Sequence, residues 1–189
     1  MDFPKINHIN FSEIISKNPN FYKDLGWLLD KSHLNEMNHF ISIDDLDFEE
    51  MQILFYRVKD IKYNPRQFRN YLNNKILTNL FYEPSTRTSS SFAAAMYKLG
   101  GEVISINEIN YSSVAKGENL RDTIRTMNCY SDIIVLRSQN AGDAKIASEV
   151  SEVPVINAGD GNGEHPTQTL LDLYTIYEKF NRIKDLTIT

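Results

Sequence analysis

The sequence predicts an α/β fold in which a parallel sheet is covered by helices on both faces. Two observations lead to this prediction. Short apolar runs alternate along the chain with longer segments whose apolar residues recur at helical spacing. The longer segments have about 10–15 residues, which is enough for a helix to connect two parallel strands. Sheets built in this way bury both of their faces beneath helices.

The expected elements follow one another in a regular order. Strands are expected at 40–43, 75–82, 102–107, 132–137 and 153–157, and residues 186–189 begin another. After the first strand, Asp44 and Asp45 are expected to accept the free N–H groups of a helix that ends at Asn64-Pro65. The later helices are expected at 89–99, 119–130, 141–150 and 166–180.

Local signals support each of these helices. The first has a stripe of apolar side chains at helical spacing, formed by Met51, Leu54/Phe55, Val58 and Ile61. Helix 89–99 is rich in alanine and stops at Gly100-Gly101, while helix 119–130 places Leu120 and Ile124 on one face. Pro166 opens the last helix at a position where its missing N–H costs nothing.

The alternating pattern suggests three parts. Residues 1–38 contain many Asn and Lys residues and are expected to form a peripheral extension. Residues 39–180 are expected to form one domain. Residues 181–189 are expected to start a second α/β domain before which this chain is truncated, because a lone strand after a helix has no partner here.

Composition excludes several classes of protein. The chain has 189 residues, 41% of them hydrophobic, and a net charge of −5 from 20 Lys+Arg against 25 Asp+Glu. Its longest apolar run, 92–97, is far shorter than the ~20 residues of a membrane span. The acidic balance without a Lys/Arg block argues against nucleic acid as a partner. Cys129 is the single cysteine, and no Cys/His cluster has zinc spacing. We expect a cytoplasmic protein with no signal peptide.

Loops that follow strands are where ligands bind in parallel sheets. The loop 83–89 combines the hydroxyls of Ser85, Thr86 and Thr88 with the guanidinium of Arg87 and the free N–H groups of a helix start. Such a set suits phosphate oxygens. The alternative is an ordinary Ser/Thr cap beside a solvated arginine, and the residues alone leave the two readings about equal.

Three further positions at the same sheet edge carry hydrogen-bond donors. Arg137 closes an apolar strand, although such an arginine usually extends to water. A glycine-rich loop delivers His165 to a helix start with Gln168 one turn later, where His165 could equally be a simple cap. The polar loop 111–118 contains Lys116, and most lysines in such loops are only solvated. The coincidence of Arg87, Arg137 and His165 is stronger than each signal and predicts a site for a small dianion.

Two long segments resemble the signatures of the aspartate/ornithine carbamoyltransferase family. Residues 81–89 (FYEPSTRTS) resemble its phosphate-binding motif, and residues 158–172 (AGDGNGEHPTQTLLD) resemble its second motif in the form of the aspartate branch. The loop 112–118 (SSVAKGE) also resembles that branch, because ornithine enzymes usually lack a lysine there. The likeness runs from about residue 40 to residue 189.

The resemblance implies a role for each candidate residue. Ser85, Thr86, Arg87 and Thr88 would hold the phosphate of carbamoyl phosphate. Arg137, His165 and Thr88 would polarise the carbonyl oxygen, and Gln168 would bind the carbamoyl amino group. Ser112 and Lys116 would enter the site of a neighbouring subunit, because the family assembles as trimers. No metal or cofactor is implied.

The implied reaction transfers the carbamoyl group from carbamoyl phosphate to the amino group of L-aspartate, giving N-carbamoyl-L-aspartate and phosphate for de novo pyrimidine biosynthesis. Residues 39–180 would form the carbamoyl-phosphate-binding domain, and the aspartate-binding half would be missing, so the chain is expected to be inactive alone. The family usually has His-Pro after the arginine, where this chain has Ser138-Gln139-Asn140. Two alternatives are an ornithine or other carbamoyltransferase and a non-catalytic module that binds carbamoyl phosphate.

Overall fold

The computed structural model describes residues 37–106, 117–184 and 186–187. The chain divides into two compact units, Met1–Glu36 and Met37–Thr189. The first unit, and with it most of the expected extension 1–38, lies outside the described residues. The second unit contains every element described below.

A four-stranded parallel sheet forms the centre of the second unit. Its strands are β1 (Ile76–Phe81), β2 (Glu102–Ile106), β3 (Ile133–Ser138) and β4 (Val155–Asp160), in the spatial order β2-β1-β3-β4. The helices are α3 (Phe48–Tyr63), α4 (Thr86–Lys98), α5 (Leu120–Asn128), α6 (Asp143–Val150) and α7 (Pro166–Phe180), with short 3₁₀ helices η2 (Ile43–Asp45) and η3 (Pro65–Phe68). The predicted α/β class is confirmed.

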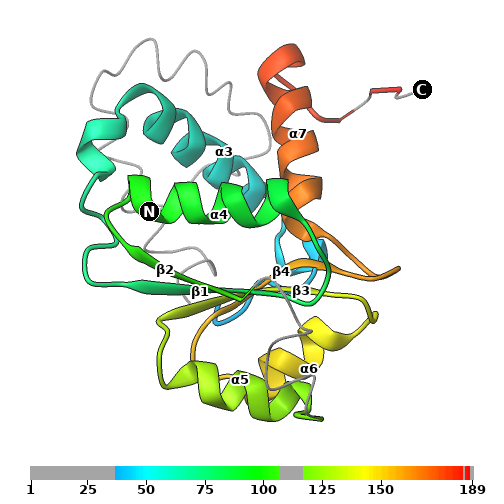
Figure 1. Cartoon of the computed structure of the whole chain (residues 1–189). Helices are drawn as coiled ribbons and strands as arrows, with labels where there is room; N and C mark the ends of the chain where they lie inside the picture. Colours follow the sequence, from blue (N-terminus) through cyan, green and yellow to red (C-terminus); the bar gives the residue numbers. More distant parts are fainter. Residues whose placement is uncertain (1–36, 107–116, 185, 188–189) are drawn as a thin grey trace, which may run out of the picture. The chain divides into compact units, whose positions relative to one another are not determined.

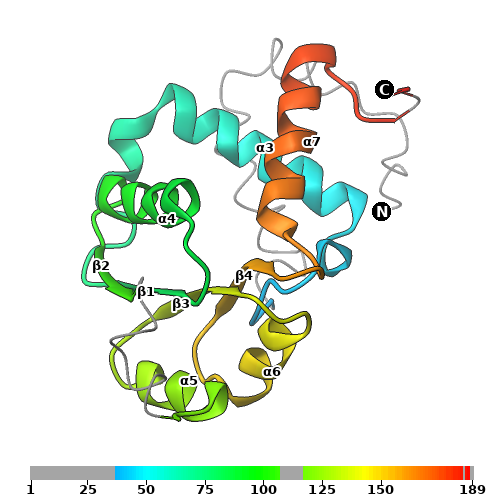
Figure 2. The same ribbon diagram turned by 45° about the vertical axis from the view of Figure 1, so that its right-hand side comes forward.

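Helices cover both faces of the sheet. Figures 1 and 2 show α5 and α6 on one face, and α4 on the other together with α3 and α7. Successive strand residues alternate between two cores. The core beneath α5 and α6 contains Leu80, Ile124, Ile134, Leu136, Ala147 and Val155. The core beneath α4 contains Leu77, Phe81, Met96, Val135 and Ala158.

The prediction for residues 40–47 is wrong in two respects. Phe40 forms only an isolated bridge with Ile156, because the chain then turns into η2 instead of continuing as a strand. The cap of α3 is Asp47, whose carboxylate accepts a hydrogen bond from the Glu50 N–H at 2.8 Å. In return, the Glu50 carboxylate accepts a hydrogen bond from the Asp47 N–H. Asp45 instead accepts from the backbone N–H groups of Ile41 and Ser42, which directly precede η2.

The expected apolar stripe on α3 is only partly correct. Phe55 is 2% exposed and packs against the rings of Tyr174 and Tyr177 on α7, but Val58 is 40% exposed. Polar residues occupy other buried positions of this helix, including Glu50 and Asp60.

Other boundaries move by a few residues. Helix α4 begins at Thr86, three residues earlier than expected, so Arg87 and Thr88 belong to its first turn. Strand β4 ends at Asp160, three residues later than expected. Helix α7 has the predicted bounds. Leu186 and Thr187 are not in a strand, and the rest of the expected strand 186–189 lies outside the described residues.

Replacing Asp47 with alanine is expected to lower the free energy of unfolding by about 1 kcal/mol, because the first turn of α3 loses its side-chain acceptor. Urea unfolding followed by circular dichroism measures this change. Asp44→Ala is the control, and its effect is expected within about 0.5 kcal/mol because Asp44 is exposed. A larger effect at Asp44 than at Asp47 would contradict the assignment of the cap.

Candidate functional site

The candidate site lies where the order of the strands reverses. From β1 the chain crosses to β2 on one side, and it then places β3 on the other side of β1. The carboxyl ends of β1 and β3 therefore border a crevice, which is the usual place for a ligand in a parallel sheet. The loop 83–85 follows β1, and Arg137 lies near the end of β3.

The first turn of α4 has free backbone donors. Ser85 is its N-cap residue, but within the described part of the chain the Ser85 side chain makes no capping hydrogen bond. In contrast, Asp47 caps α3 and Asn119 caps α5. The first N–H groups of a helix have no partner within the helix, and their dipoles favour a negative charge. The reading of residues 85–89 as an ordinary Ser/Thr cap thus loses its main support.

Arg137 is held in place by neighbours on both sides. It pairs in register with Phe81 of β1, and its Nε donates to Glu83 Oε2 at 2.9 Å. Its Nη1 donates to the Ala158 carbonyl at 3.0 Å. A side chain at position 159 would overlap this guanidinium, so Gly159, whose φ is +113°, is required there. With 21% of its side chain exposed, Arg137 does not simply extend into water.

His165 is the N-cap residue of α7. Its Nδ1 accepts from the Gln168 backbone N–H at 3.3 Å and lies 3.2 Å from Thr167 Oγ1. An Nδ1 that accepts a hydrogen bond carries no proton, so the neutral ring has its proton on Nε2. Capping and a functional role are therefore compatible, because capping leaves Nε2–H as a fixed donor.

The environment keeps this imidazole neutral. Partial burial and the positive charge of Arg137 lower the pKa of His165 below its ordinary value of 6.5. Arg137 thus influences the pKa of His165, although Arg137 lies in β3 and His165 lies at the start of α7.

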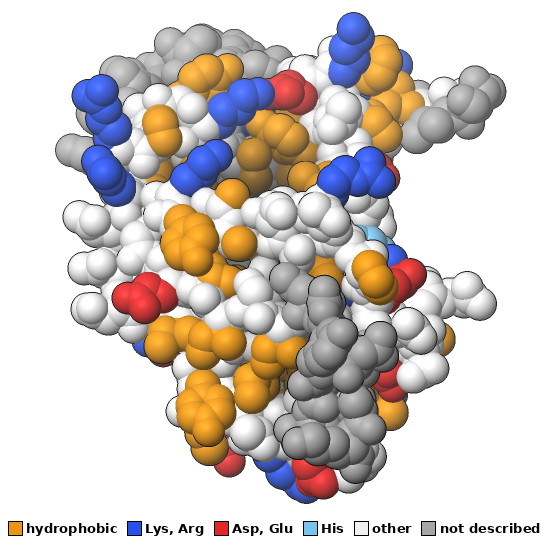
Figure 3. All heavy atoms as spheres, viewed as in Figure 1, with side chains coloured by type: hydrophobic (Ala, Val, Ile, Leu, Met, Phe, Trp, Pro, Cys, Tyr) orange, Lys and Arg blue, Asp and Glu red, His pale blue; other side chains and the backbone are white. Residues whose placement is uncertain are grey.

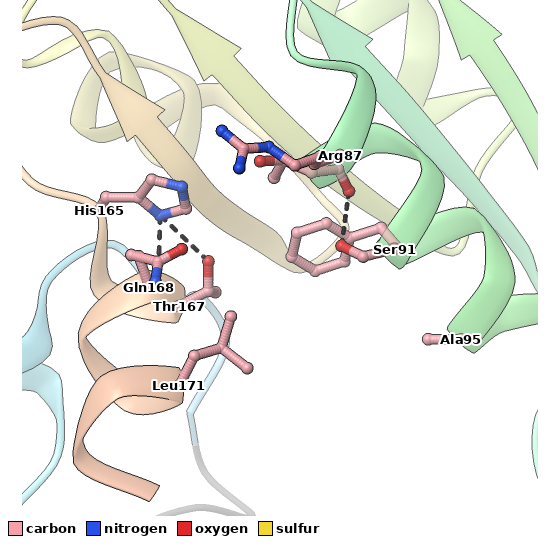
Figure 4. A pocket seen from close by; sticks show the side chains of 9 residues that line it. Arg87, Ser91, Ala95, His165, Thr167, Gln168 and Leu171 are labelled. Carbon is pink, nitrogen blue, oxygen red and sulfur yellow. Dashed lines mark hydrogen bonds between the residues drawn. The ribbon is translucent and has the colours of Figure 1, made fainter. Parts of the chain in front are cut away.

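A cavity of about 400 Å³ lies between the first turns of α4 and α7. It is lined by Arg87, Thr88, Ser91, Phe92, Ala95, His165, Thr167, Gln168 and Leu171. Figure 4 shows Arg87 and His165 on opposite sides of the space between these helices, with Leu171 farther along α7. The surface view in Figure 3 shows hydrophobic, Lys and Arg side chains on one face of the molecule. Among the residues that line the cavity, Phe92, Ala95 and Leu171 are apolar, and the others are polar or charged. The cavity thus has a polar end and an apolar end.

The structure brings together four of the predicted site residues. Arg87, Thr88, His165 and Gln168 line the cavity. Of the other described candidates, Ser85 and Thr86 lie at the start of α4. Arg137 contacts Glu83 in the loop before α4 and is not among the residues that line the cavity. Ser112 and Lys116 lie outside the described residues, so their predicted entry into a neighbouring site stays a prediction.

Two supporting residues were not singled out from the sequence. Asn79 is fully buried in β1, and its Nδ2 donates to the Ser89 carbonyl of α4 at 2.9 Å, which ties the first turns of α4 to the sheet. A polar residue within the apolar run 75–82 was a usable signal. Glu83 holds Arg137, but nothing in their spacing along the chain indicates this pair.

The departure from the family pattern at 138–140 leaves Arg137 in position. Ser138 Oγ is hydrogen bonded to Asp143 Oδ2, and Asn140 Nδ2 donates to the same oxygen at 3.1 Å. Gln139 Nε2 donates to the Tyr82 carbonyl at 3.3 Å. Polar contacts within this chain therefore shape the loop after β3.

Within 37–106, 117–184 and 186–187, no three His, Cys, Asp or Glu side chains gather in a way that could hold a metal ion. Within the same ranges, no helix is long and apolar enough to cross a membrane.

The fold and the site define a parallel α/β domain with a cavity lined by Arg87 and His165 beside the first turn of α4. Residues 38–178 match the carbamoyl-P binding domain of the aspartate/ornithine carbamoyltransferase family. Because this match covers most of the chain, the chain belongs to the aspartate/ornithine carbamoyltransferase family.

Individual relatives are about 50% identical in sequence to this chain over the aligned region. An aspartate carbamoyltransferase catalytic subunit of Clostridium perfringens (strain SM101) is 52% identical over 150 residues, covering 79% of this chain and 49% of the relative. The corresponding subunit of Methanocaldococcus jannaschii is 51% identical over 154 residues, covering 80% and 50%. The chain thus spans about half the length of the curated relatives it matches.

Solved structures agree with this placement. The catalytic subunit of M. jannaschii aspartate transcarbamoylase superposes with a TM-score of 0.72 at 51% identity, covering 77% of this chain and 48% of that one. Aspartate transcarbamoylase from Trypanosoma cruzi, solved with carbamoyl phosphate and aspartate, gives 0.72 at 38% identity with the same coverage.

The His165 ring is expected to carry its proton on Nε2 near pH 7.5 and to titrate below pH 6.5. The folded state binds this proton less readily than the unfolded chain, so His165 reduces stability only as the pH falls below about 6.5. Long-range ¹H–¹⁵N NMR spectra recorded against pH measure both properties, and His165→Asn identifies the signals. A proton on Nδ1, or titration above 6.5, would contradict this assignment.

Proposed function

We propose that this chain forms the carbamoyl-phosphate half of an aspartate carbamoyltransferase. The observation that carries the proposal is that Arg87 and His165, which are far apart in the sequence, line one cavity beside the uncapped start of α4. The relatives named above support the choice of carbamoyl phosphate and aspartate as substrates.

The phosphate group would bind at the first turn of α4. Free N–H groups there, the Thr88 hydroxyl and the guanidinium of Arg87 are all donors, and each charge-assisted hydrogen bond contributes about 1.5–3 kcal/mol. Ser85 and Thr86 would add hydroxyl donors at the same helix end. A net negative chain requires such a local concentration of positive charge to attract a dianion.

The carbamoyl group would lie toward α7. His165 would donate from Nε2 to the carbonyl oxygen, and Arg137 and Thr88 would aid this polarisation. Gln168 Nε2 donates to Asp172 Oδ1 at 3.0 Å, which orients the amide so that its oxygen can accept from the carbamoyl amino group.

The chemical step is nucleophilic addition followed by elimination. The amino group of aspartate attacks the carbamoyl carbon and forms the new C–N bond. Donors aimed at the carbonyl oxygen stabilise the negative charge of the tetrahedral intermediate, and each can contribute about 2.7–4 kcal/mol. The bond between the carbamoyl carbon and the bridging oxygen of the phosphate group then breaks. Phosphate leaves with that oxygen and its bonding electrons, and it can accept the amine proton. The product is N-carbamoyl-L-aspartate, an intermediate of de novo pyrimidine biosynthesis.

The subunit arrangement and location extend the proposal. Ser112 and Lys116 would complete the site of a neighbouring subunit in a homotrimer, as the resemblance to the family implies. The whole enzyme would act in the cytoplasm. The relatives' names favour aspartate over ornithine as the acceptor.

Replacing Arg87 with alanine is expected to weaken carbamoyl phosphate binding at least tenfold, because a charge-assisted hydrogen bond to the phosphate is lost. Isothermal titration calorimetry at constant ionic strength measures the affinity. Arg121→Ala is a matched control, since Arg121 lies on α5, which covers the opposite face of the sheet, and pairs with Glu149. Equal affinities for Arg87→Ala and Arg121→Ala would overturn the phosphate assignment.

Lys116→Ala is expected to lower carbamoyl phosphate affinity of a homotrimer whose sites are shared between subunits. Mixing Lys116→Ala with Arg87→Ala subunits is expected to restore part of the binding, because some shared sites then contain both native residues. Calorimetry of the mixture measures recovery, and light scattering checks for a mass three times that of the 21.8 kDa chain. A trimer without recovery would place Lys116 in its own subunit's site or in none.

A further inference from the structure

The loop that follows Arg137 and the loop that leads to His165 meet at one buried carboxylate. Asp160 ends β4 and is 6% exposed. Its Oδ2 accepts from the Gly142 N–H at 2.9 Å, and its Oδ1 accepts from the Glu164 N–H at 2.8 Å. Gly142 lies five residues after Arg137, and Glu164 directly precedes His165.

Backbone contacts reinforce the same junction. Asp160 pairs in register with Ser138, the residue after Arg137. The Gly161 N–H donates to the Ser138 carbonyl at 2.9 Å, and the Gly163 N–H donates to the Asp160 carbonyl at 2.9 Å. The loop after β3 and the loop after β4 are therefore joined on both sides of the Asp160 side chain.

We infer that Asp160 is a positioning residue that holds Arg137 and His165 in fixed relation, because it accepts hydrogen bonds from the loop that follows Arg137 and from the loop that leads to His165. Binding a small dianion with several donors requires those donors to keep one geometry, because reorganisation would offset the gain from each hydrogen bond. The inference rests on the proposed function for its ligand, whereas the coupling of the two loops is a property of the chain alone.

The sign of the effect separates positioning from simple electrostatics. Removing a negative charge beside a cationic site strengthens anion binding if charge alone matters. If Asp160 acts through the two loops, its loss weakens anion binding in spite of the favourable change in charge. Asp160→Asn is nearly isosteric, but the NH₂ group of asparagine cannot accept a hydrogen bond, so one of the two backbone N–H groups loses its acceptor.

Asp143→Asn is the matched control. It removes the same charge from a carboxylate that contacts Ser138 and Asn140 in the loop after β3. None of the hydrogen bonds of the Asp143 side chain in the described residues reaches the loop 161–165.

The experiment titrates the 189-residue chain with inorganic phosphate and records the His165 ring signals by NMR. For Asp160→Asn we expect phosphate affinity to fall about tenfold and the His165 signals to shift. For Asp143→Asn we expect unchanged or tighter phosphate binding and unshifted His165 signals. Asp160→Asn with native His165 signals and undiminished affinity would overturn the inference.

A second variant covers the case in which Asp160→Asn does not fold. A side chain at position 163 would overlap Asp160 Oδ1, so Gly163→Ala displaces the carboxylate without changing any charge. It is expected to reproduce the shifted His165 signals and the weaker phosphate binding, and native behaviour would contradict the inference. Failure of the unmodified chain to bind phosphate would count against the proposed function, while the His165 signals would still test the coupling.

Discussion

The side-by-side pairing of β1 and β3 is the constraint on which the candidate site depends. The register places Arg137 beside Phe81, so its guanidinium reaches Glu83 in the loop that follows β1. Helix α4 starts two residues after that loop's Pro84 and directs its free N–H groups toward the same crevice. Positive potential is thereby concentrated at one edge of a sheet in a chain whose net charge is −5.

His165 illustrates how one side chain serves both the fold and the site. Its Nδ1 caps α7, which is a structural task, and this bond fixes the tautomer that presents Nε2–H to the cavity. Burial and Arg137 then lower the pKa of His165, so the ring stays neutral in the range where a neutral donor is useful. The cap of α7 and the Nε2–H donor that the proposed function requires are therefore two consequences of one geometry.

The sequence predicted the ends of a helix best where only one nearby residue could mark each end. Helix α7 has both of its predicted ends, and Pro166 marks the first because a proline is tolerated at the first helical position. The structure adds that Asn181 follows the last turn in a left-handed conformation, with φ +56°. Helix α3 was harder to place, since Asp44, Asp45 and Asp47 are all good caps. Which of these aspartates caps α3 depends on Ser42 and Ile43. Both donate hydrogen bonds to the Glu164 carboxylate, and the chain therefore forms η2 before α3 begins.

The sequence by itself determined the α/β class, the family resemblance and the set of donors, because these depend on residue type and short-range spacing. Only the tertiary structure decided which donors share a cavity and which residues support them. Glu83 and Arg137 are 54 positions apart, and Asp160 contacts Gly142 across 18 positions. Such contacts depend on the order and register of the strands, and both arise from packing of the whole sheet instead of from any local segment.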